Sequence, residues 1–231
     1  MEQLVFELAA PEPPSFESFL PGPNAEVVAA LMRFATGDAT ETGLLLWGAP
    51  GAGKTHLLRA VVRVIEMRGA TATYCPEPGV LEGADAEALG AQALVAIDGI
   101  DVASAAAQAT VFTLYNALKA NGGHLIAASR VSPAALPLRE DVRTRLGWGL
   151  VYEVTPLSDA DKPAALLDYA RRRGFTLGDD VIRYLLAHGR RDMTALCTTL
   201  AALDRHSLST KRAITVPLLR DWLQREMPLG R

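Results

Sequence analysis

Hydrophobic and polar positions follow one pattern in the first two thirds of the chain and another in the last third. Before Pro156, short apolar runs alternate with stretches in which apolar residues recur every three or four positions. The runs predict strands and the periodic stretches predict helices. Five strands are expected, at about 43–47, 71–75, 93–97, 124–128 and 150–154. Because strands that alternate with helices form parallel sheets, we expect a ligand at the carboxyl ends of the strands.

Only helical periodicity remains after Pro156, which predicts a second, all-helical unit. Its helices are expected at about 158–173, 179–188, 192–207 and 217–226. Further helices are expected from a cap at Asn24 to about Phe34, and from Ala103 to Ala120. Prolines exclude regular structure from the first residues, so we expect an extended tail, an α/β base domain and a helical domain. Their expected bounds are 1–12, 13–157 and 158–231.

Composition narrows the class of protein. The 231 residues are 49% hydrophobic and carry 23 basic against 26 acidic side chains, which excludes a disordered or polybasic chain. Residues 1–160 carry 10 basic and 18 acidic side chains, whereas residues 161–231 carry 13 and 8. The distant Cys75 and Cys197 predict neither a disulfide framework nor a metal-ligand pair. Without a basic, apolar leader or an apolar run of about 18 residues, the chain is expected to be cytoplasmic, with no membrane partner.

The segment from Gly48 to Thr55 matches the phosphate-loop pattern G-x-x-x-x-G-K-[ST]. It lies between a predicted strand and a predicted helix, which is the context that the pattern requires. Glycines let backbone N–H groups converge on phosphate oxygens, and the helix presents its positive end. The alternative is a glycine-rich turn that binds nothing. We predict that ADP or ATP is bound by Gly48, Ala49, Pro50, Gly51, Ala52, Gly53, Lys54 and Thr55.

The third predicted strand is followed by Asp98, a position from which an apolar strand delivers a carboxylate to the water shell of Mg²⁺. With the Thr55 hydroxyl, Asp98 predicts a magnesium site that is contacted through water. Hydrolytic relatives usually carry a second carboxylate directly afterwards, where this chain has Gly99. We therefore expect slow intrinsic hydrolysis. Asp101 is either a substitute for the missing carboxylate or a solvated loop residue.

Three segments carry a more specific resemblance than the loop pattern alone. Gly51–Leu58, Glu140–Leu150 and Arg191–Met193 resemble the AAA+ module of the bacterial replication initiator DnaA. The closing segments Leu203–Ser209 and Lys211–Pro217 look more like Hda, the regulatory inactivator of DnaA. The resemblance covers nearly the whole chain. It implies an α/β P-loop AAA+ domain, with a parallel five-stranded sheet flanked by helices, and a small all-α lid domain.

The resemblance also implies roles for single residues. It places His56 beside the phosphate loop, Ser129 at the sensor-1 position and Arg191 at the sensor-2 position of the lid, all as nucleotide contacts. Asn24 ends a stretch that resembles the adenine-side loop. The family's usual Ser-Asp-Arg pattern after the fourth strand is Ser129-Arg130 in this chain. The alternative for Arg191 is a solvent-facing arginine.

Arg145 matches the family's arginine finger, which reaches the nucleotide of a neighbouring subunit. A guanidinium suits this role because it is planar, always charged and able to meet two phosphate oxygens at once. From the sequence alone, the alternative is a surface salt-bridge partner in the amphipathic stretch 138–146. The Gly-Trp-Gly segment that follows favours the finger, supplied in trans as a catalytic group alongside Asp98.

Gln3, Leu4, Phe6 and Leu8 form an alternating pattern near the amino terminus. In an extended segment the three apolar side chains lie on one side, next to a glutamine that can hydrogen-bond the backbone of a cleft. The pattern resembles the hexapeptide by which replication proteins bind the sliding clamp, the DNA polymerase III β subunit. The alternative is an ordinary edge strand.

These features favour a regulator of replication initiation. The resemblance to Hda implies a protein that binds the sliding clamp and stimulates ATP hydrolysis by ATP-bound DnaA, while its own nucleotide is turned over weakly at most. The implied partners are DnaA, the clamp and a second copy of the chain, with DNA reached only indirectly. The alternative is a DNA-acting AAA+ ATPase, such as an initiator or helicase loader; a P-loop kinase fits less well. DnaA carries a DNA-binding domain after its lid, and the lack of one before Arg231 favours the regulator.

Overall fold

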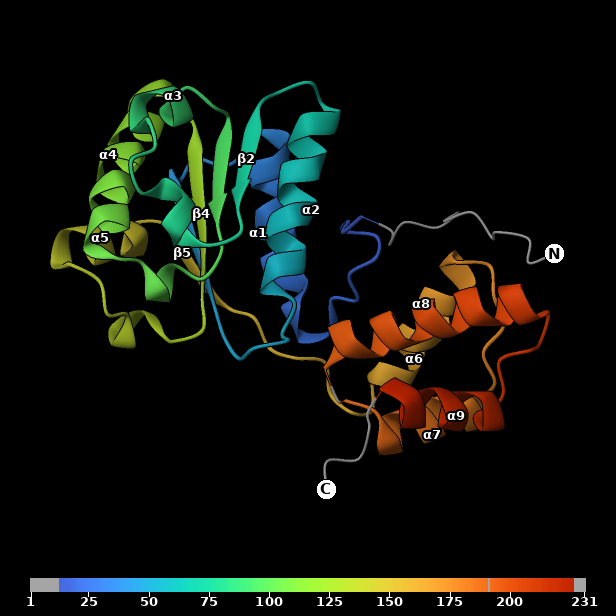
Figure 1. The fold of residues 1–231 in the computed structure, drawn as a ribbon. Helices are drawn as coiled ribbons and strands as arrows, with labels where there is room; N and C mark the ends of the chain where they lie inside the picture. The colour runs from blue at the N-terminus through green and yellow to red at the C-terminus, as the bar shows by residue number, and fades with distance from the viewer. Residues whose placement is uncertain (1–12, 191, 227–231) are drawn as a thin grey trace. The chain divides into compact units, whose positions relative to one another are not determined.

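A computed structural model describes residues 13–190 and 192–226 of the chain (Figure 1). The chain divides into two compact units, one formed by Pro13–Pro156 and one that includes the helices after Leu157. Five of the predicted site residues lie outside the described residues: Gln3, Leu4, Phe6, Leu8 and Arg191. Clamp binding by the tail and nucleotide contact by the lid arginine therefore stay predictions.

The base unit is built on a sheet of five parallel strands, which confirms the predicted fold. The strands are β1 (Gly43–Trp47), β2 (Ala72–Cys75), β3 (Leu94–Ile97), β4 (His124–Ser129) and β5 (Leu150–Glu153). They lie in the order β2-β3-β4-β1-β5. The central strands β1, β3 and β4 are almost entirely buried, as continuous apolar runs covered on both faces should be. The edge strand β5 alternates between half-buried and exposed residues.

Helices cover both faces of the sheet (Figure 1). One layer holds α1 (Ala25–Thr36) and α2 (Lys54–Met67), and the other holds α4 (Ala105–Asn121) and α5 (Glu140–Gly147). Successive side chains of a strand point to opposite faces, so Leu44 and Leu46 pack with the first layer and Leu45 packs with the second. Short helices complete the unit: α3 (Ala86–Gly90), η1 (Gly22–Asn24), η2 (Pro78–Leu81), η3 (Ile100–Val102) and η4 (Pro133–Ala135).

Asn24 does not cap α1 with its side chain, so the predicted capping role is wrong. The residue is 2% exposed and bonds instead to the segment after β5. Its Nδ2 donates to the Thr155 carbonyl at 2.9 Å, and its Oδ1 accepts from the Thr155 amide at 2.8 Å. The Asn24 side-chain amide therefore links the start of α1 to the segment after β5 and does not cap the helix.

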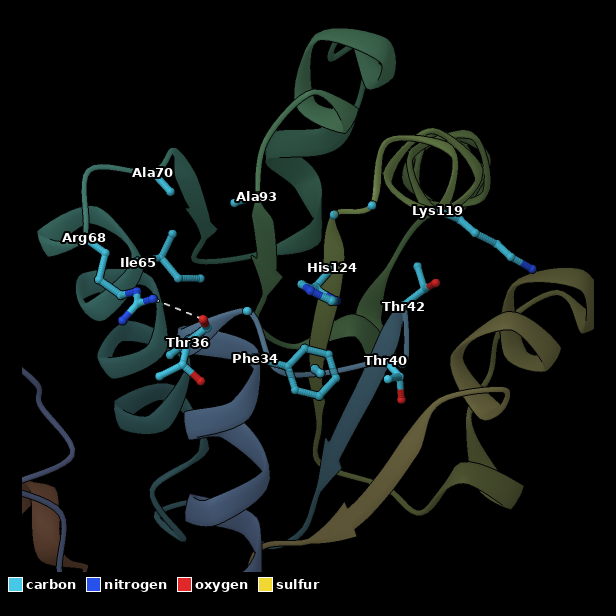
Figure 2. A pocket seen from close by; sticks show the side chains of 15 residues that line it. Phe34, Thr36, Thr40, Thr42, Ile65, Arg68, Ala70, Ala93, Lys119 and His124 are labelled. Atoms are coloured by element: carbon cyan, nitrogen blue, oxygen red, sulfur yellow. Dashed lines mark hydrogen bonds between the residues drawn. The ribbon is translucent and has the colours of Figure 1, made fainter.

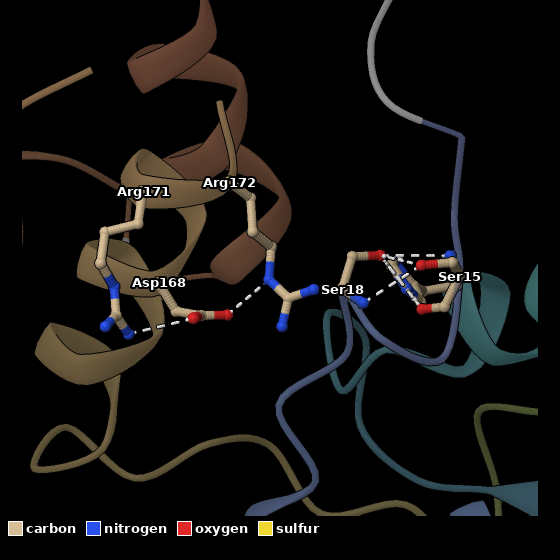
Figure 3. A network of polar contacts seen from close by, with 6 residues as sticks. Ser15, Ser18, Asp168, Arg171 and Arg172 are labelled. Atoms are coloured by element: carbon tan, nitrogen blue, oxygen red, sulfur yellow. Dashed lines mark hydrogen bonds and ion pairs between the residues drawn. The ribbon is translucent and has the colours of Figure 1, made fainter. Parts of the chain in front are cut away.

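The second unit is all helical in its described part, which confirms the predicted lid fold. Its helices are α6 (Lys162–Arg172), α7 (Asp179–His188), α8 (Met193–Thr210) and α9 (Val216–Glu226). They enclose an apolar core that includes the fully buried Leu200 and Leu219. On α6, Asp168 pairs with Arg171 at 3.1 Å and with Arg172 at 2.6 Å (Figure 3). Within residues 13–190 and 192–226, no helix is long and apolar enough to cross a membrane.

Candidate functional site

Three strands end side by side at the carboxyl edge of the base sheet. The register pairs Trp47 of β1 with Ser129 of β4, and β3 runs beside β4 in the same direction. The segments that follow these strands begin at Gly48, Asp98 and Arg130, and they therefore lie next to one another. Ligands of open parallel sheets bind at this edge, so the predicted phosphate loop stands where a ligand is expected.

The loop that follows β1 has a backbone that glycine adopts most readily. Gly48, Gly51 and Gly53 have φ values of 143°, 76° and 103°. A Cβ at Gly48 would lie 2.4 Å from the Val154 carbonyl oxygen, and one at Gly53 would lie 2.6 Å from Cε2 of Phe19. The loop leads into α2, whose first N–H groups have no acceptor within the helix. A helix amino terminus of this kind attracts phosphate.

Lys54 is buried beneath this loop, with 7% of its surface exposed. Its ammonium donates to the carbonyl oxygens of Gly48 and Ala49 at 2.6 and 2.9 Å. Burial lowers the pKa of Lys54, and the negative charges of Asp98 and Asp101 oppose that shift. A buried ammonium whose hydrogen bonds go to neutral carbonyls fits a phosphate group, because the anion would supply charge that the carbonyls lack.

Thr55 and Asp98 meet beside the loop, where Thr55 Oγ1 donates to Asp98 Oδ2 at 2.5 Å. Tyr74, in β2, donates its hydroxyl to the same oxygen at 3.2 Å, and the Arg59 guanidinium lies 4.8 Å from the Tyr74 ring centroid. Burial raises the pKa of Tyr74, so the phenol keeps the proton that it donates. No group of three His, Cys, Asp or Glu that would hold a metal by itself occurs in the described part of the chain. Thr55 and Asp98 instead fit Mg²⁺, which usually takes one or two protein oxygens together with phosphates and water.

His56 contacts the first segment of the base unit. Its Nε2 lies 2.8 Å from the Ser15 carbonyl oxygen and 3.3 Å from Ser18 Oγ, and its ring centroid lies 5.7 Å from that of Phe19. Ser15 and Ser18 also bond to each other (Figure 3). Burial lowers the pKa of His56, against the opposing effect of the Ser15 carbonyl. His56 therefore anchors this segment to α2, and its direct contact with a nucleotide stays a prediction.

Asp101 and Ser129 are both engaged by neighbouring groups. The Asp101 side chain is 6% exposed and accepts from the Arg130 amide at 3.1 Å and from Arg130 Nε at 2.9 Å. It is not a solvated loop carboxylate, so that expectation is wrong. The Ser129 hydroxyl is buried, donates to the Val131 carbonyl at 2.8 Å and accepts from the Val131 amide at 3.0 Å. Direct contact between Ser129 and a nucleotide would require this hydroxyl to give up its bond to Val131.

Arg145 lies on α5 near the start of β1, whereas the phosphate loop follows the end of that strand. A Cβ built at Gly43, the first residue of β1, would lie 3.9 Å from the Arg145 carbonyl oxygen. The guanidinium donates to Asn116 Oδ1 at 3.2 Å and lies 3.8 Å from the Phe112 ring centroid. The neighbouring Trp148 is 60% exposed. No carboxylate pairs with Arg145 among the described residues, so the surface salt-bridge interpretation gains no support.

A cavity of about 560 Å³ lies at the opposite, amino edge of the sheet (Figure 2). It is lined by Thr42 and Ala93, which precede β1 and β3, and by His124 at the start of β4. Arg68 and Lys119 bring positive charge to it. Since ligands of parallel sheets bind at the carboxyl ends of strands, this cavity is separate from the candidate phosphate site.

Comparisons with known proteins agree with this geometry. The family model described as "Hda, lid domain" matches residues 159–223. Domain III of the Thermotoga maritima replication initiation protein DnaA has a TM-score of 0.79 at 17% identity, with 94% of this chain and 98% of that chain covered. AMPPCP-bound DnaA from Aquifex aeolicus has a TM-score of 0.71 at 19% identity, with 83% and 65% covered. Residues 159–223 therefore match the Hda lid family, and the chain shares its fold with these DnaA structures.

The sequence did not predict three side chains at this site: Arg59, Tyr74 and Arg130. Tyr74 lies near the end of a predicted strand, so the rule that parallel strands end at one edge could have placed it near Asp98. Arg59 comes one helical turn after Thr55, which puts both on one face of α2. Arg130 was visible as a departure from the usual family pattern. Its bond to a carboxylate 29 positions earlier is set by the sheet and has no signal in the sequence.

Proposed function

We propose that this protein binds an adenine nucleotide at its phosphate loop and uses Arg145 to stimulate ATP hydrolysis by DnaA. The observation that carries this proposal is the separation of the two groups of residues. Lys54, Thr55 and Asp98 gather at the carboxyl edge of the sheet, whereas Arg145 lies near the start of β1. A five-residue strand is about 13 Å long, and α4 holds the guanidinium in place. Arg145 therefore serves a nucleotide other than that of its own chain.

Each group in the proposed nucleotide site has one task. The backbone amides of residues 51–55 surround the phosphates, and Lys54 neutralises their charge. Thr55 and Asp98 hold Mg²⁺ through water, and the ion when bound neutralises charge on the phosphates. Residues 19–24 form the adenine side. The DnaA of Aquifex aeolicus was solved with AMPPCP, and the shared fold supports an adenine nucleotide in this chain.

Slow turnover of the protein's own nucleotide belongs to the proposal. Gly99 follows Asp98 with a φ of 65° and offers no carboxylate. Asp101, the other candidate base, is engaged by two hydrogen bonds to Arg130. Bound ADP would then stabilise the protein as a cofactor and would not be a substrate.

The environment of Arg145 suits a side chain that is presented to a phosphate group. Phe112 holds the guanidinium by a cation–π contact, and Asn116 orients it through a neutral hydrogen bond. Both contacts leave its charge uncompensated. An arginine finger supplied in trans is worth about 10³ to 10⁵ in the rate of phosphoryl transfer. The resulting hydrolysis would leave DnaA in its ADP form, which prevents re-initiation.

The tail is proposed to bind the DNA polymerase III β sliding clamp through Gln3, Leu4, Phe6 and Leu8. The support is their sequence pattern and the exposed apolar surface that it would form. Through the clamp, the protein would reach newly replicated DNA indirectly. A second copy of the chain is a further expected partner, and the cytoplasm is the expected compartment.

Direct action on DNA is the alternative, and three of the lid arginines that could serve it have carboxylate partners. Arg171 and Arg172 pair with Asp168, and Arg190 lies 3.4 Å from Asp192. Binding to the phosphates of DNA depends on basic side chains that are available to displace counterions. Strongly salt-dependent binding of the isolated protein to duplex DNA would favour the alternative.

Hydrolysis of ATP prebound to DnaA tests the proposed function. The reaction is followed with the full-length protein and a DNA-loaded clamp together, and again with either one left out. The proposal expects rapid conversion to ADP only when both are present. Equal hydrolysis with and without the protein would refute it.

A further inference from the structure

Arg130 stands at the centre of the carboxyl edge of the sheet. It directly follows Ser129, which is paired with Trp47 in the register, so it lies next to Gly48 at the start of the phosphate loop. On its other side, β3 leads to Asp98. Arg130 thus lies between the loop and the proposed metal-side carboxylate, although neither the loop pattern nor the assigned roles include it.

A buried carboxylate fixes the base of this side chain. Asp101 is only 6% exposed and accepts two hydrogen bonds from Arg130, one from the backbone amide and one from Nε. The Arg130 side chain itself is 54% exposed. Its terminal nitrogens have no hydrogen-bond partner in the described ranges 13–190 and 192–226. A guanidinium held at Nε and free at its terminal nitrogens presents two parallel donors, the geometry that matches phosphate oxygens.

We propose that Arg130 is a further nucleotide-binding residue, which contacts the terminal phosphate of a nucleoside triphosphate, and that Asp101 is its positioning residue. This inference rests on the proposed nucleotide site and deepens it. The Ser129 hydroxyl is bonded to Val131 and does not offer a contact to the terminal phosphate. Arg130, held by Asp101, would make that contact instead. Asp101 would then be a support for a cation and not a base that activates water.

The test compares affinities for ADP and for a non-hydrolysable ATP analogue, both with Mg²⁺, by calorimetry on the full-length protein. In Arg130→Ala we expect the affinity for the analogue to fall about tenfold or more, as for loss of a charge-assisted hydrogen bond, and the affinity for ADP to change less than about threefold. Asp101→Asn should lower the affinity for the analogue in the same direction but less, and Arg130→Lys should restore part of it. Arg139→Ala is the matched control, because Arg139 is also about half exposed, at 51%, and likewise pairs with a carboxylate, Asp141, at 2.6 Å.

The outcomes separate this inference from the function on which it rests. If the unaltered protein binds neither nucleotide, the proposed nucleotide site itself fails. If it binds both and Arg130→Ala leaves the ratio of the two affinities unchanged, the inference is wrong and the pair only fixes the loops. Melting temperatures of the ADP-bound variants show whether each one folds, and Arg130→Ala decides the question even if Asp101→Asn does not fold.

Discussion

At Gly48 the phosphate loop runs so close to the segment after β5 that a side chain does not fit. The nearest atom to an added Cβ is the Val154 backbone oxygen, at 2.4 Å. The Val154 backbone is held by a hydrogen bond from its amide to the Trp47 carbonyl, so it cannot move aside as the end of a flexible side chain can. The loop pattern predicts a glycine at this position for phosphate binding, and the structure adds a packing reason that acts without any ligand.

Gly48→Ala is expected to destabilise the base unit by about 3 kcal/mol or more, because it adds a steric clash to an unfavourable φ. Gly69→Ala is the matched control: Gly69 also has a positive φ, 82°, but has open space around its Cβ position. It should cost about 1 kcal/mol. Urea unfolding of both variants measures the difference, and equal losses of stability would show that the contact with Val154 has no effect.

Single residues also mark where prediction from the sequence ends. Lys54, Thr55 and Asp98 were predicted because a short pattern and a strand end determine their positions. The roles of Asn24 and Asp101 depend on partners 131 and 29 positions away, which the strand order brings close. Neighbouring residues in the sequence predict the commonest role for each, a helix cap for Asn24 and a solvated carboxylate for Asp101. In the structure both side chains instead bond to residues that are distant in the sequence.

At the scale of elements, the segment 13–19 is held against α2. Arg63 donates to the Pro13 carbonyl at 3.1 Å, and His56, about two turns earlier on the same face of the helix, contacts the Ser15 carbonyl. Phe19 closes over Gly53. The segment that precedes α1 is thereby coupled to the helix that begins at the phosphate loop.

This coupling predicts a pH dependence of stability. Since burial lowers the pKa of His56 below its ordinary value of 6.5, the unfolded chain binds more protons than the folded protein at acidic pH. The stabilisation by neutral His56 is therefore complete above about pH 6.5 and is lost as the pH falls through the lower pKa of the folded state. In His56→Gln the free energy of unfolding should fall less between pH 7.5 and 5.

The unaltered protein, measured over the same pH range, is the reference for this experiment. If His56→Gln gives the same profile as the unaltered protein, the buried contact with Ser15 does not determine the acid sensitivity.

The elements differ in how well the sequence predicted them. The central strands and the long helices were found because their apolar period continues over enough residues. The five residues of α3 are too few to show a period, and that helix starts from Asp85, whose carboxylate accepts from the amides of Glu87 and Ala88. The order of the strands was not predicted, since crossover connections leave it open.

On the scale of the whole molecule, the chain combines a lid region that matches the Hda lid family, a base with the fold of DnaA, and a tail for which we propose a partner of its own. If the tail only tethers the protein, changing it should leave the nucleotide site intact. Gln3→Ala combined with Leu4→Ala is expected to abolish binding to immobilised sliding clamp, measured by surface plasmon resonance, and to leave ADP affinity unchanged. An unaltered affinity for the clamp would remove the tail from the proposal.

The role of Arg145 connects the site to the proposed function most directly. The measurement is the single-turnover hydrolysis of ATP bound to DnaA, with DNA-loaded clamp present. If Arg145 acts as the finger, Arg145→Ala should remove the stimulation and lower the hydrolysis rate by about 10³-fold or more. The variant should still bind ADP and the clamp, and Arg139→Ala should stimulate as the unaltered protein does. Full stimulation by Arg145→Ala would contradict the account.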